Sequence, residues 1–322
     1  MSVRSSIDTF ADLEKRYPDD ESPGEDADLR VYGCIKQFHL LKKRHRHLKV
    51  VLSIGGPDQK TAANYAALSA SPASRANFVE SSLTAIEDYG FDGIDLFWEW
   101  PKDVTEASNY TNLIEDIRKA LDLYSSEQGS KHLCLSVACP AGTEQYNLLD
   151  LKRMDKHVDF WNLVAHDFTG ESNSPVSGHQ ANVFKVREEL ITPFNPAQAV
   201  SDLLENDIEP EKILLGCPLY GRGFSNTEGL GKAFSGVPAG EVKEGIRDYK
   251  DLPLPGAEVK FDSAANAAYS YDDEKKELFS FDNPASLSMK SNFILSQQLG
   301  GAMFWEASGD RQDEGSLTTL VS

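Results

Sequence analysis

At residues 91–101 the chain reads Phe91-Asp92-Gly93-Ile94-Asp95-Leu96-Phe97-Trp98-Glu99-Trp100-Pro101. Side chains alternate between the two faces of a strand, so positions 95, 97 and 99 share one face while Ile94, Leu96 and Trp98 share the other. A carboxylate inside a buried strand loses several kcal/mol of solvation unless it lines a cavity or has a partner. The pattern therefore predicts a strand with one core face and one face that belongs to a site.

Strand and helix patterns alternate on both sides of this stretch. Helices are expected near 34–46, 74–88, 107–123, 196–206 and 284–298, and strands near 48–56, 132–139, 158–167, 212–219 and 300–307. Such alternation implies parallel strands with right-handed crossovers, in a doubly wound sheet or in a (β/α)8 barrel.

The residues at the strand ends favour the barrel. Polar, glycine or aromatic residues stand at or just beyond these ends: Gly55-Gly56, Glu99, Pro140-Ala141-Gly142, His166-Asp167, Tyr220-Gly221-Arg222 and Trp305-Glu306. A barrel builds its site at those ends. No glycine-rich phosphate loop opens a helix, so a dinucleotide-binding fold has no support.

The pattern changes between residues 224 and 282, where short runs are rich in Gly, Pro, Tyr and Asp. One of these runs predicts a hairpin that turns at Asp273-Glu274. We therefore expect a barrel made of residues 1–223 and 283–322, with an α+β insertion at 224–282.

Composition narrows the classes of partner. The 322 residues are 40% hydrophobic, enough for a sizeable core, and their formal net charge is -19. This charge would repel nucleic acid, so neutral or cationic partners are expected. No apolar run approaches the ~20 residues of a membrane span, and residues 1–6 lack the apolar core of a secretion signal, so no compartment is predicted.

Several motifs resemble those of the glycoside hydrolase family 18 chitinases, especially the fungal-type endochitinases, over residues 8–316. Asp92, Gly93, Asp95 and Glu99 match the family's D-G-x-D-x-D-x-E strand, and Phe97 stands in place of its middle aspartate. The runs 53–56, 162–167, 220–222 and 301–306 also look like motifs of the family. The resemblance implies a TIM-barrel fold of the α/β class, a small α+β subdomain, and chitin or chito-oligosaccharides as partners.

These motifs correspond to the third through the eighth strands of the family's barrel. We therefore expect six barrel strands, with the first two absent. Such a barrel has two open edges that need a cover to prevent aggregation. The chain would be an incomplete product of a longer protein, or it would close differently or with a partner.

The resemblance also implies a mechanism in which the substrate's own N-acetyl group attacks the anomeric carbon while the last carboxylate protonates the leaving oxygen. Glu99 fits this acid role, and Asp95 is the other residue predicted to be catalytic. Asp95 lies about 13 Å from Glu99 along the strand, too far for a direct glycosidase pair. Phe97 cannot orient the acetamido group as an aspartate does, and losing one such contact typically costs on the order of 10²–10³ in rate.

The remaining predicted site residues are substrate contacts: Asp92, Phe97, Trp100, His166, Asp167, Tyr220, Arg222 and Trp305. His166 stands where the family has a tyrosine that holds the acetamido group. The substrate supplies the nucleophile, so no metal or organic cofactor is implied.

Other interpretations of these residues stay open. Glu99 could be a buried glutamate paired with Arg222 or His166. Arg222 and Tyr220 could hold a carboxylate, and Trp305 could belong to the core, as Trp98 is expected to. The phenyl ring at position 97 could also fill the vacant pocket and exclude the sugar.

The sequence supports three hypotheses of function. The first is a weak or inactive retaining hydrolase that keeps Glu99 as its acid. The second is a chitin-oligomer-binding protein without turnover. The third is a truncated product without independent function.

Overall fold

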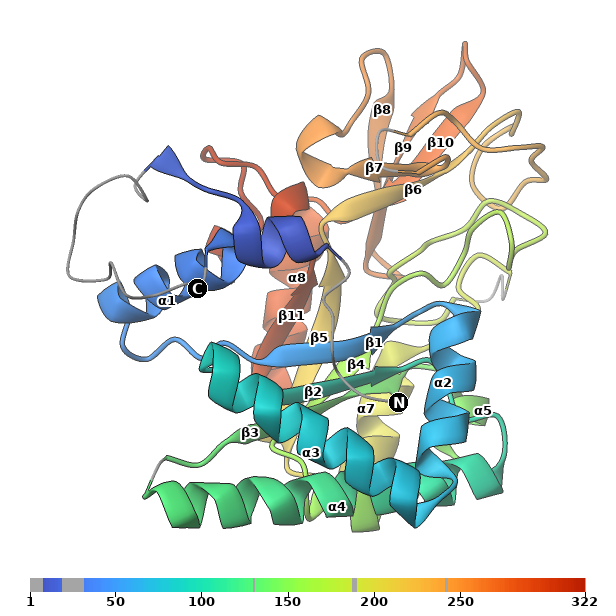
Figure 1. Ribbon diagram of the computed structural model, residues 1–322. Coiled ribbons are helices and arrows are strands. Elements are labelled where there is room, and N and C mark those ends of the chain that lie inside the picture. Colours follow the sequence, from blue (N-terminus) through green and yellow to red (C-terminus); the bar gives the residue numbers. More distant parts are fainter. Residues whose placement is uncertain (1–7, 19–31, 130, 187–189, 241–242, 322) are drawn as a thin grey trace. The chain divides into compact units, whose positions relative to one another are not determined.

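The computed structural model describes residues 8–18, 32–129, 131–186, 190–240 and 243–321 (Figure 1). They form two compact units, one of residues up to 137 with 156–159, the other of 138–155 with 160–322. Before residue 34, the described residues hold the short helix η1 (Phe10–Glu14). Among the described helices, none combines the length and apolar character that crossing a membrane requires.

The first unit contains parallel strands. β1 (Leu52–Gly56) pairs with β2 (Gly93–Trp98), and β2 pairs with β3 (Cys134–Pro140), which continues into the second unit. The helices are α1 (Gly33–Arg44), α2 (Gln59–Ser69), α3 (Pro72–Tyr89) and α4 (Val104–Gln128), and Figure 1 shows α3 and α4 packed alongside each other. The expected helices near 34–46, 74–88 and 107–123 are thus confirmed.

α3 illustrates how local sequence sets these helices. Its N-terminus is capped by the Ser71 hydroxyl, which accepts a hydrogen bond from the Ser74 amide, and Pro72 occupies the first turn. It ends at Gly90, whose φ of 66° suits glycine. α2 was not expected, because its sequence QKTAANYAALS lacks a strong apolar stripe, although Asp58 caps it in the same way.

The core of the first unit is built around Trp98. Its ring stacks on Tyr65 with 5.4 Å between ring centroids and meets Tyr110 edge-on at 5.1 Å. Ile94 and Leu96, on the same face of β2, are fully buried. The predicted core face of the strand and the predicted core position of Trp98 are therefore confirmed.

The second unit contains parallel strands in the order β4 (Phe160–Val164), β5 (Ile213–Pro218) and β11 (Gly301–Trp305). Its helices are α5 (Thr143–Tyr146), α6 (Leu151–Asp155), α7 (Pro196–Glu205) and α8 (Pro284–Ser296), with short turns η3 (Pro210–Lys212), η4 (Tyr249–Asp251), η5 (Ala307–Gly309) and η6 (Thr318–Leu320). Over the described residues, the chain therefore has six parallel strands, the number that the motifs predict.

The second unit also holds an antiparallel sheet in the order β7-β6-β10-β9-β8. Its strands are β6 (Tyr220–Phe224), β7 (Ile246–Asp248), β8 (Glu258–Asp262), β9 (Ala267–Asp272) and β10 (Glu277–Phe281). β9 and β10 pair with Asp272 opposite Glu277, which confirms the hairpin about Asp273-Glu274. The sheet begins at Tyr220, before the expected start of the insertion, and the assignment of 224–282 as a separate subdomain stays a prediction.

Candidate active site

The first acidic residue of the motif, Asp92, lies just before β2. Its Oδ2 accepts a hydrogen bond from the Val50 amide at 2.8 Å and lies 2.6 Å from Lys42 Nζ. The next residue must be glycine, because a Cβ at Gly93 would lie 2.0 Å from the Cys134 carbonyl oxygen. In an extended chain Asp92 is about 23 Å from Glu99, and its contact with a sugar stays a prediction.

Asp95 lies in the middle of β2 and joins the three strands of the first unit. Ser53 on β1 donates its hydroxyl proton to Oδ2 at 2.6 Å, and Ser136 on β3 donates to Oδ1 at 2.7 Å. Both carboxylate oxygens are thus bonded, which compensates the desolvation of a partly buried charge. The serine of the 53–56 motif therefore holds this aspartate.

Phe97 occupies the next position on the same face of β2 and is only 9% exposed. Gly55 makes this close packing possible, because a Cβ there would lie 2.1 Å from the Phe97 carbonyl oxygen. Glu99 and Trp100 follow the strand and are half-buried. Asp95, Phe97 and Glu99 thus follow one another along β2 and just beyond its end, in the order carboxylate, phenyl ring, carboxylate.

A second set of predicted residues comes together in the second unit. Asp167 follows β4 with φ of 63°, a left-handed conformation that Asp tolerates better than most residues. Its Oδ1 accepts hydrogen bonds from the Tyr220 hydroxyl at 2.5 Å and from Arg222 Nε at 2.6 Å, both on β6. Tyr220 and Arg222 therefore hold a carboxylate, while their contact with a sugar stays a prediction.

The charges in this set stabilise one another. Burial by itself would raise the pKa of Asp167, but the hydrogen bond and the positive charge of Arg222 outweigh it and hold the pKa below its usual value. The same ion pair raises the pKa of Arg222 against the effect of burial. Both groups are ionised at neutral pH.

His166 lies beside this ion pair and is 7% exposed. Its Nδ1 is 3.2 Å from the Tyr220 hydroxyl, whereas its Nε2 has no hydrogen-bond partner among the described residues. Burial is the main cause that lowers the pKa of His166, against the opposing charge of Asp167. A neutral imidazole at this position can donate or accept one hydrogen bond through Nε2.

Two features near this set were not singled out in the sequence. Gln180 donates its side-chain N–H to the carbonyl oxygens of Tyr220 at 2.7 Å and Ser280 at 3.1 Å, which fixes the start of β6. Lys290 and Asp282 form a buried ion pair at 2.5 Å, with each side chain 2% exposed. The spacing of eight residues across the start of α8 was the only signal, and it is too common to indicate a buried pair.

Trp305, the last residue of β11, pairs with Pro218 of β5 and is 40% exposed. Its carbonyl oxygen accepts a hydrogen bond from the Leu219 amide at 2.7 Å. The exposed fraction places this indole at the surface of the second unit rather than in its core. Within the described ranges, no group of three or more His, Cys, Asp or Glu side chains is placed to hold a metal ion.

Comparisons with known proteins agree with these motifs. The profile of Glycosyl hydrolases family 18 matches residues 7–310. Endochitinase 1 of Metarhizium robertsii is 45% identical over 316 residues, which cover 97% of this chain and 73% of that protein. Chitinase 1 of Aphanocladium album is 43% identical over 324 residues, covering 98% of this chain and 75% of that protein.

Solved structures extend the likeness to the fold. The catalytic domain of psychrophilic chitinase B from Arthrobacter TAD20 superimposes with a TM-score of 0.87 at 30% identity, over 98% of this chain and 79% of that chain. The expected TIM-barrel class is confirmed by this likeness together with the six parallel strands. On sequence and fold alike, the chain belongs to glycosyl hydrolase family 18.

Proposed function

We propose that this protein binds β-1,4-linked N-acetylglucosamine oligomers and hydrolyses them slowly, with Glu99 as the proton donor. The family and the relatives named as chitinases support the substrate class. A family 18 chitinase from Cycas revoluta, 25% identical with a TM-score of 0.78 over 89% of this chain and 82% of that chain, was solved in complex with (GlcNAc)3. The observation that carries the slow rate is Phe97, buried on β2 at the position two residues after Asp95 and two before Glu99.

The proposed reaction needs one acid and a stabilised cation. Glu99 protonates the leaving glycosidic oxygen while the substrate's acetamido oxygen attacks the anomeric carbon, and water then opens the resulting oxazolinium with net retention. A carboxylate at position 97 would accept the acetamido N–H and oppose the positive charge. A phenyl ring does neither, so we expect a rate lower by on the order of 10²–10³.

The residues of the second unit can still contact a sugar. Both hydrogen bonds to Asp167 fall on Oδ1, so Oδ2 remains open to a hydroxyl or an amide N–H. The exposed Trp305 offers an aromatic face on which a pyranose ring can stack. These contacts support affinity independently of turnover.

A second candidate function is binding of chito-oligosaccharides without turnover. Two observations favour this function. The Asp167–Arg222 pair, which could contact a sugar, is intact, whereas position 97 carries a phenyl ring in place of a carboxylate. In this case Glu99 would contribute a hydrogen bond only.

Calorimetric titration with chitin hexamer, followed by mass spectrometry of the mixture, separates these functions. We expect heat and slowly formed shorter products from the wild type. Glu99→Gln should bind without products, and Phe97→Asp should form products at least about tenfold faster. Phe97→Leu is the matched control, because it changes the ring without adding a carboxylate, and it should stay as slow as the wild type.

Each other outcome has a definite meaning. Bound but intact hexamer with both the wild type and Phe97→Asp would identify a binding protein. If folded protein gives neither heat nor reaction products in any variant, both sugar functions are wrong. The remaining hypothesis is then a truncated protein without independent function.

A further inference from the structure

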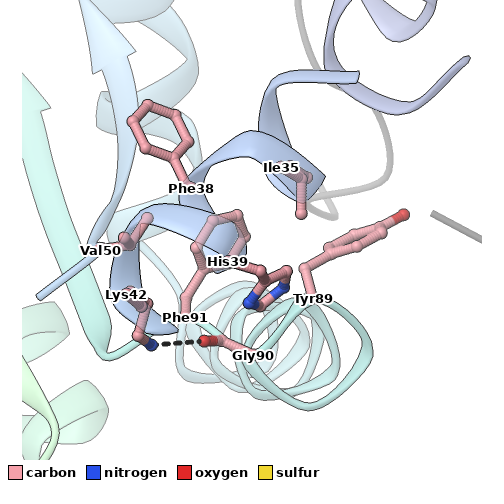
Figure 2. Close-up of a pocket in the computed structure, with 8 residues that line it drawn as sticks. All are labelled: Ile35, Phe38, His39, Lys42, Val50, Tyr89, Gly90 and Phe91. Atoms are coloured by element: carbon pink, nitrogen blue, oxygen red, sulfur yellow. Dashed lines mark hydrogen bonds between the residues drawn. The ribbon is translucent and has the colours of Figure 1, made fainter. Parts of the chain in front are cut away.

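Some side chains in this structure donate to the backbone of a segment that is distant in the sequence. Figure 2 shows one in the first unit, where Lys42 Nζ donates to the Gly90 carbonyl oxygen at 3.2 Å and so joins α1 to the end of α3. In the second unit Gln180 makes contacts of this kind, and its side chain is fully buried. A side chain without exposed surface cannot touch a sugar, so any effect of Gln180 on binding must pass through other residues.

The backbone of Gln180 holds the turn that carries Asp167. Its carbonyl oxygen accepts a hydrogen bond from the amide of Phe168, the residue directly after Asp167, at 3.1 Å. Asp167 has a left-handed φ of 63°. Such a conformation persists only where the surrounding structure holds it. The hydrogen bond to Gln180 is one of the contacts that do so.

The side chain of Gln180 holds the start of β6. Its Nε2 donates to the Tyr220 carbonyl oxygen at 2.7 Å, and the Tyr220 hydroxyl in turn donates to Asp167 Oδ1 at 2.5 Å. Together with the bond from the Phe168 amide, these contacts close a ring that begins and ends at Asp167. The members of a closed ring move less independently than two groups joined by one bond, because displacing one member strains the other contacts.

Gln180 also holds the strand next to β6. Its Nε2 donates to the Ser280 carbonyl oxygen at 3.1 Å, and its backbone amide donates to the Ser280 hydroxyl at 2.9 Å. Ser280 on β10 is paired with Arg222 on β6. Gln180 therefore contacts the residue after Asp167, the backbone of Tyr220 and the pairing partner of Arg222, and these three residues are predicted sugar contacts of the second unit.

We propose that Gln180 is a positioning residue that holds these three predicted sugar contacts as one rigid set and thereby raises the affinity for chito-oligosaccharides. The inference rests on the proposed function, in which Asp167 Oδ2 accepts a hydrogen bond from the sugar. Hydrogen bonds weaken steeply as their angle and distance depart from the ideal. A set that is already in place before the sugar arrives also avoids the cost of ordering these side chains on binding.

A purely structural role for Gln180 would affect the stability of the fold and leave the affinity of the folded protein unchanged. Asn182 provides the matched control for this alternative. Its side chain is 1% exposed, and its Nδ2 also donates to two backbone carbonyl oxygens, those of Phe184 at 3.1 Å and Phe194 at 2.9 Å. Neither phenylalanine is a predicted sugar contact, so losing these bonds should cost stability alone.

Calorimetric titration with chitin hexamer compares the wild type with Gln180→Met and Asn182→Leu. Both substitutions remove the amide donors and nearly conserve the volume of the side chain. We expect Gln180→Met to raise Kd at least about tenfold, because two backbone carbonyl oxygens lose the donor that fixes them. Asn182→Leu should change Kd less than about twofold. Thermal melts establish that each variant is folded at the temperature of the titration.

A double-variant cycle tests whether Gln180 acts through Asp167. Asp167→Gly removes the carboxylate, and glycine suits the left-handed φ at this position. In the Asp167→Gly background, the loss of affinity caused by Gln180→Met should shrink to less than about threefold, because the group to be positioned is gone. A structural effect would be independent of Asp167, so the same tenfold loss in both backgrounds would contradict the proposal.

Amide hydrogen exchange separates this inference from the proposed function. Peptides that cover residues 166–170 and 218–223 should exchange faster in Gln180→Met than in Asn182→Leu, without any sugar, because the ring of contacts is opened. If the wild type gives no heat with the hexamer but exchange changes in this way, sugar binding and the gain in affinity are wrong, while the held set of residues stands. Unchanged exchange in Gln180→Met, or an unchanged Kd in a wild type that binds, would overturn the positioning role.

Discussion

Arg222 Nε donates to Asp167 Oδ1 at 2.6 Å, across 55 residues of sequence, and this ion pair joins β6 to the residue that follows β4. It lowers the pKa of Asp167. A carboxyl group with a lowered pKa in the folded state adds stability above its unfolded pKa, and that stability is lost as the pH falls through the folded pKa.

We therefore expect Asp167→Asn to lower the free energy of unfolding by about 1 kcal/mol at pH 7, a value reduced from that of a buried pair because the Asp167 side chain is 39% exposed. The difference from the wild type should begin to narrow below about pH 4 and vanish only as the pH falls through the lowered pKa of folded Asp167, below which both proteins carry a neutral group. Urea unfolding at pH 7 and pH 3.5 measures this difference in unfolding free energy.

Asp207→Asn is the control, since Asp207 has the same φ of 63° and an exposed ion pair, and no measurable change is expected. A pH-independent difference for Asp167→Asn would contradict this account.

Gly55→Ala tests the close approach of β1 to β2. The added Cβ would lie 2.1 Å from the Phe97 carbonyl oxygen, with φ of 121°. Gly229→Ala is the matched control, because its φ of 119° carries the same backbone strain and no described atom lies within 4 Å of its Cβ. We expect Gly55→Ala to lower the free energy of unfolding by about 2 kcal/mol more than the control. Equal losses of unfolding free energy in the two variants would show that backbone strain alone explains the glycine at position 55.

Lys290→Met tests the buried ion pair with Asp282. Removing the cation leaves a carboxylate that is 2% exposed and that still accepts a hydrogen bond from the Ser286 hydroxyl, so we expect a loss of about 3–5 kcal/mol. The double variant Lys290→Met with Asp282→Asn should lose less than the single one, because no unpaired charge remains. Urea unfolding of the two single variants and the double variant completes the cycle, and strictly additive losses would argue against coupling.

Much of the fold could be predicted because its strands show characteristic apolar patterns and its helices begin and end at recognisable residues. The face shared by Ile94, Leu96 and Trp98 is core, as alternation requires. α2 was not predicted because an alanine-rich helix shows little difference in hydrophobicity between its two faces. The antiparallel sheet begins earlier than expected because Tyr220 follows β5 almost directly, and nothing local marks the change of sheet.

The candidate site was predictable in its residues but less so in its contacts. Motif spacing identifies Asp95 and Asp167, yet their partners come from elsewhere in the chain. Ser136 is 41 residues from Asp95, and Arg222 is 55 residues from Asp167. Such pairings depend on strand register, which single-residue patterns do not specify.

The hydrogen bonds from Ser53 and Ser136 to Asp95 bear on what a substitution at position 97 could restore. Ser53 and Ser136 each donate to one oxygen of the Asp95 carboxylate, which thereby links β1, β2 and β3. An aspartate introduced at position 97 would therefore be two residues from Asp95, whose carboxylate already accepts two hydrogen bonds. Any rate regained by a substitution at position 97 would therefore come from the new carboxylate itself, beside an aspartate that is already held in the sheet.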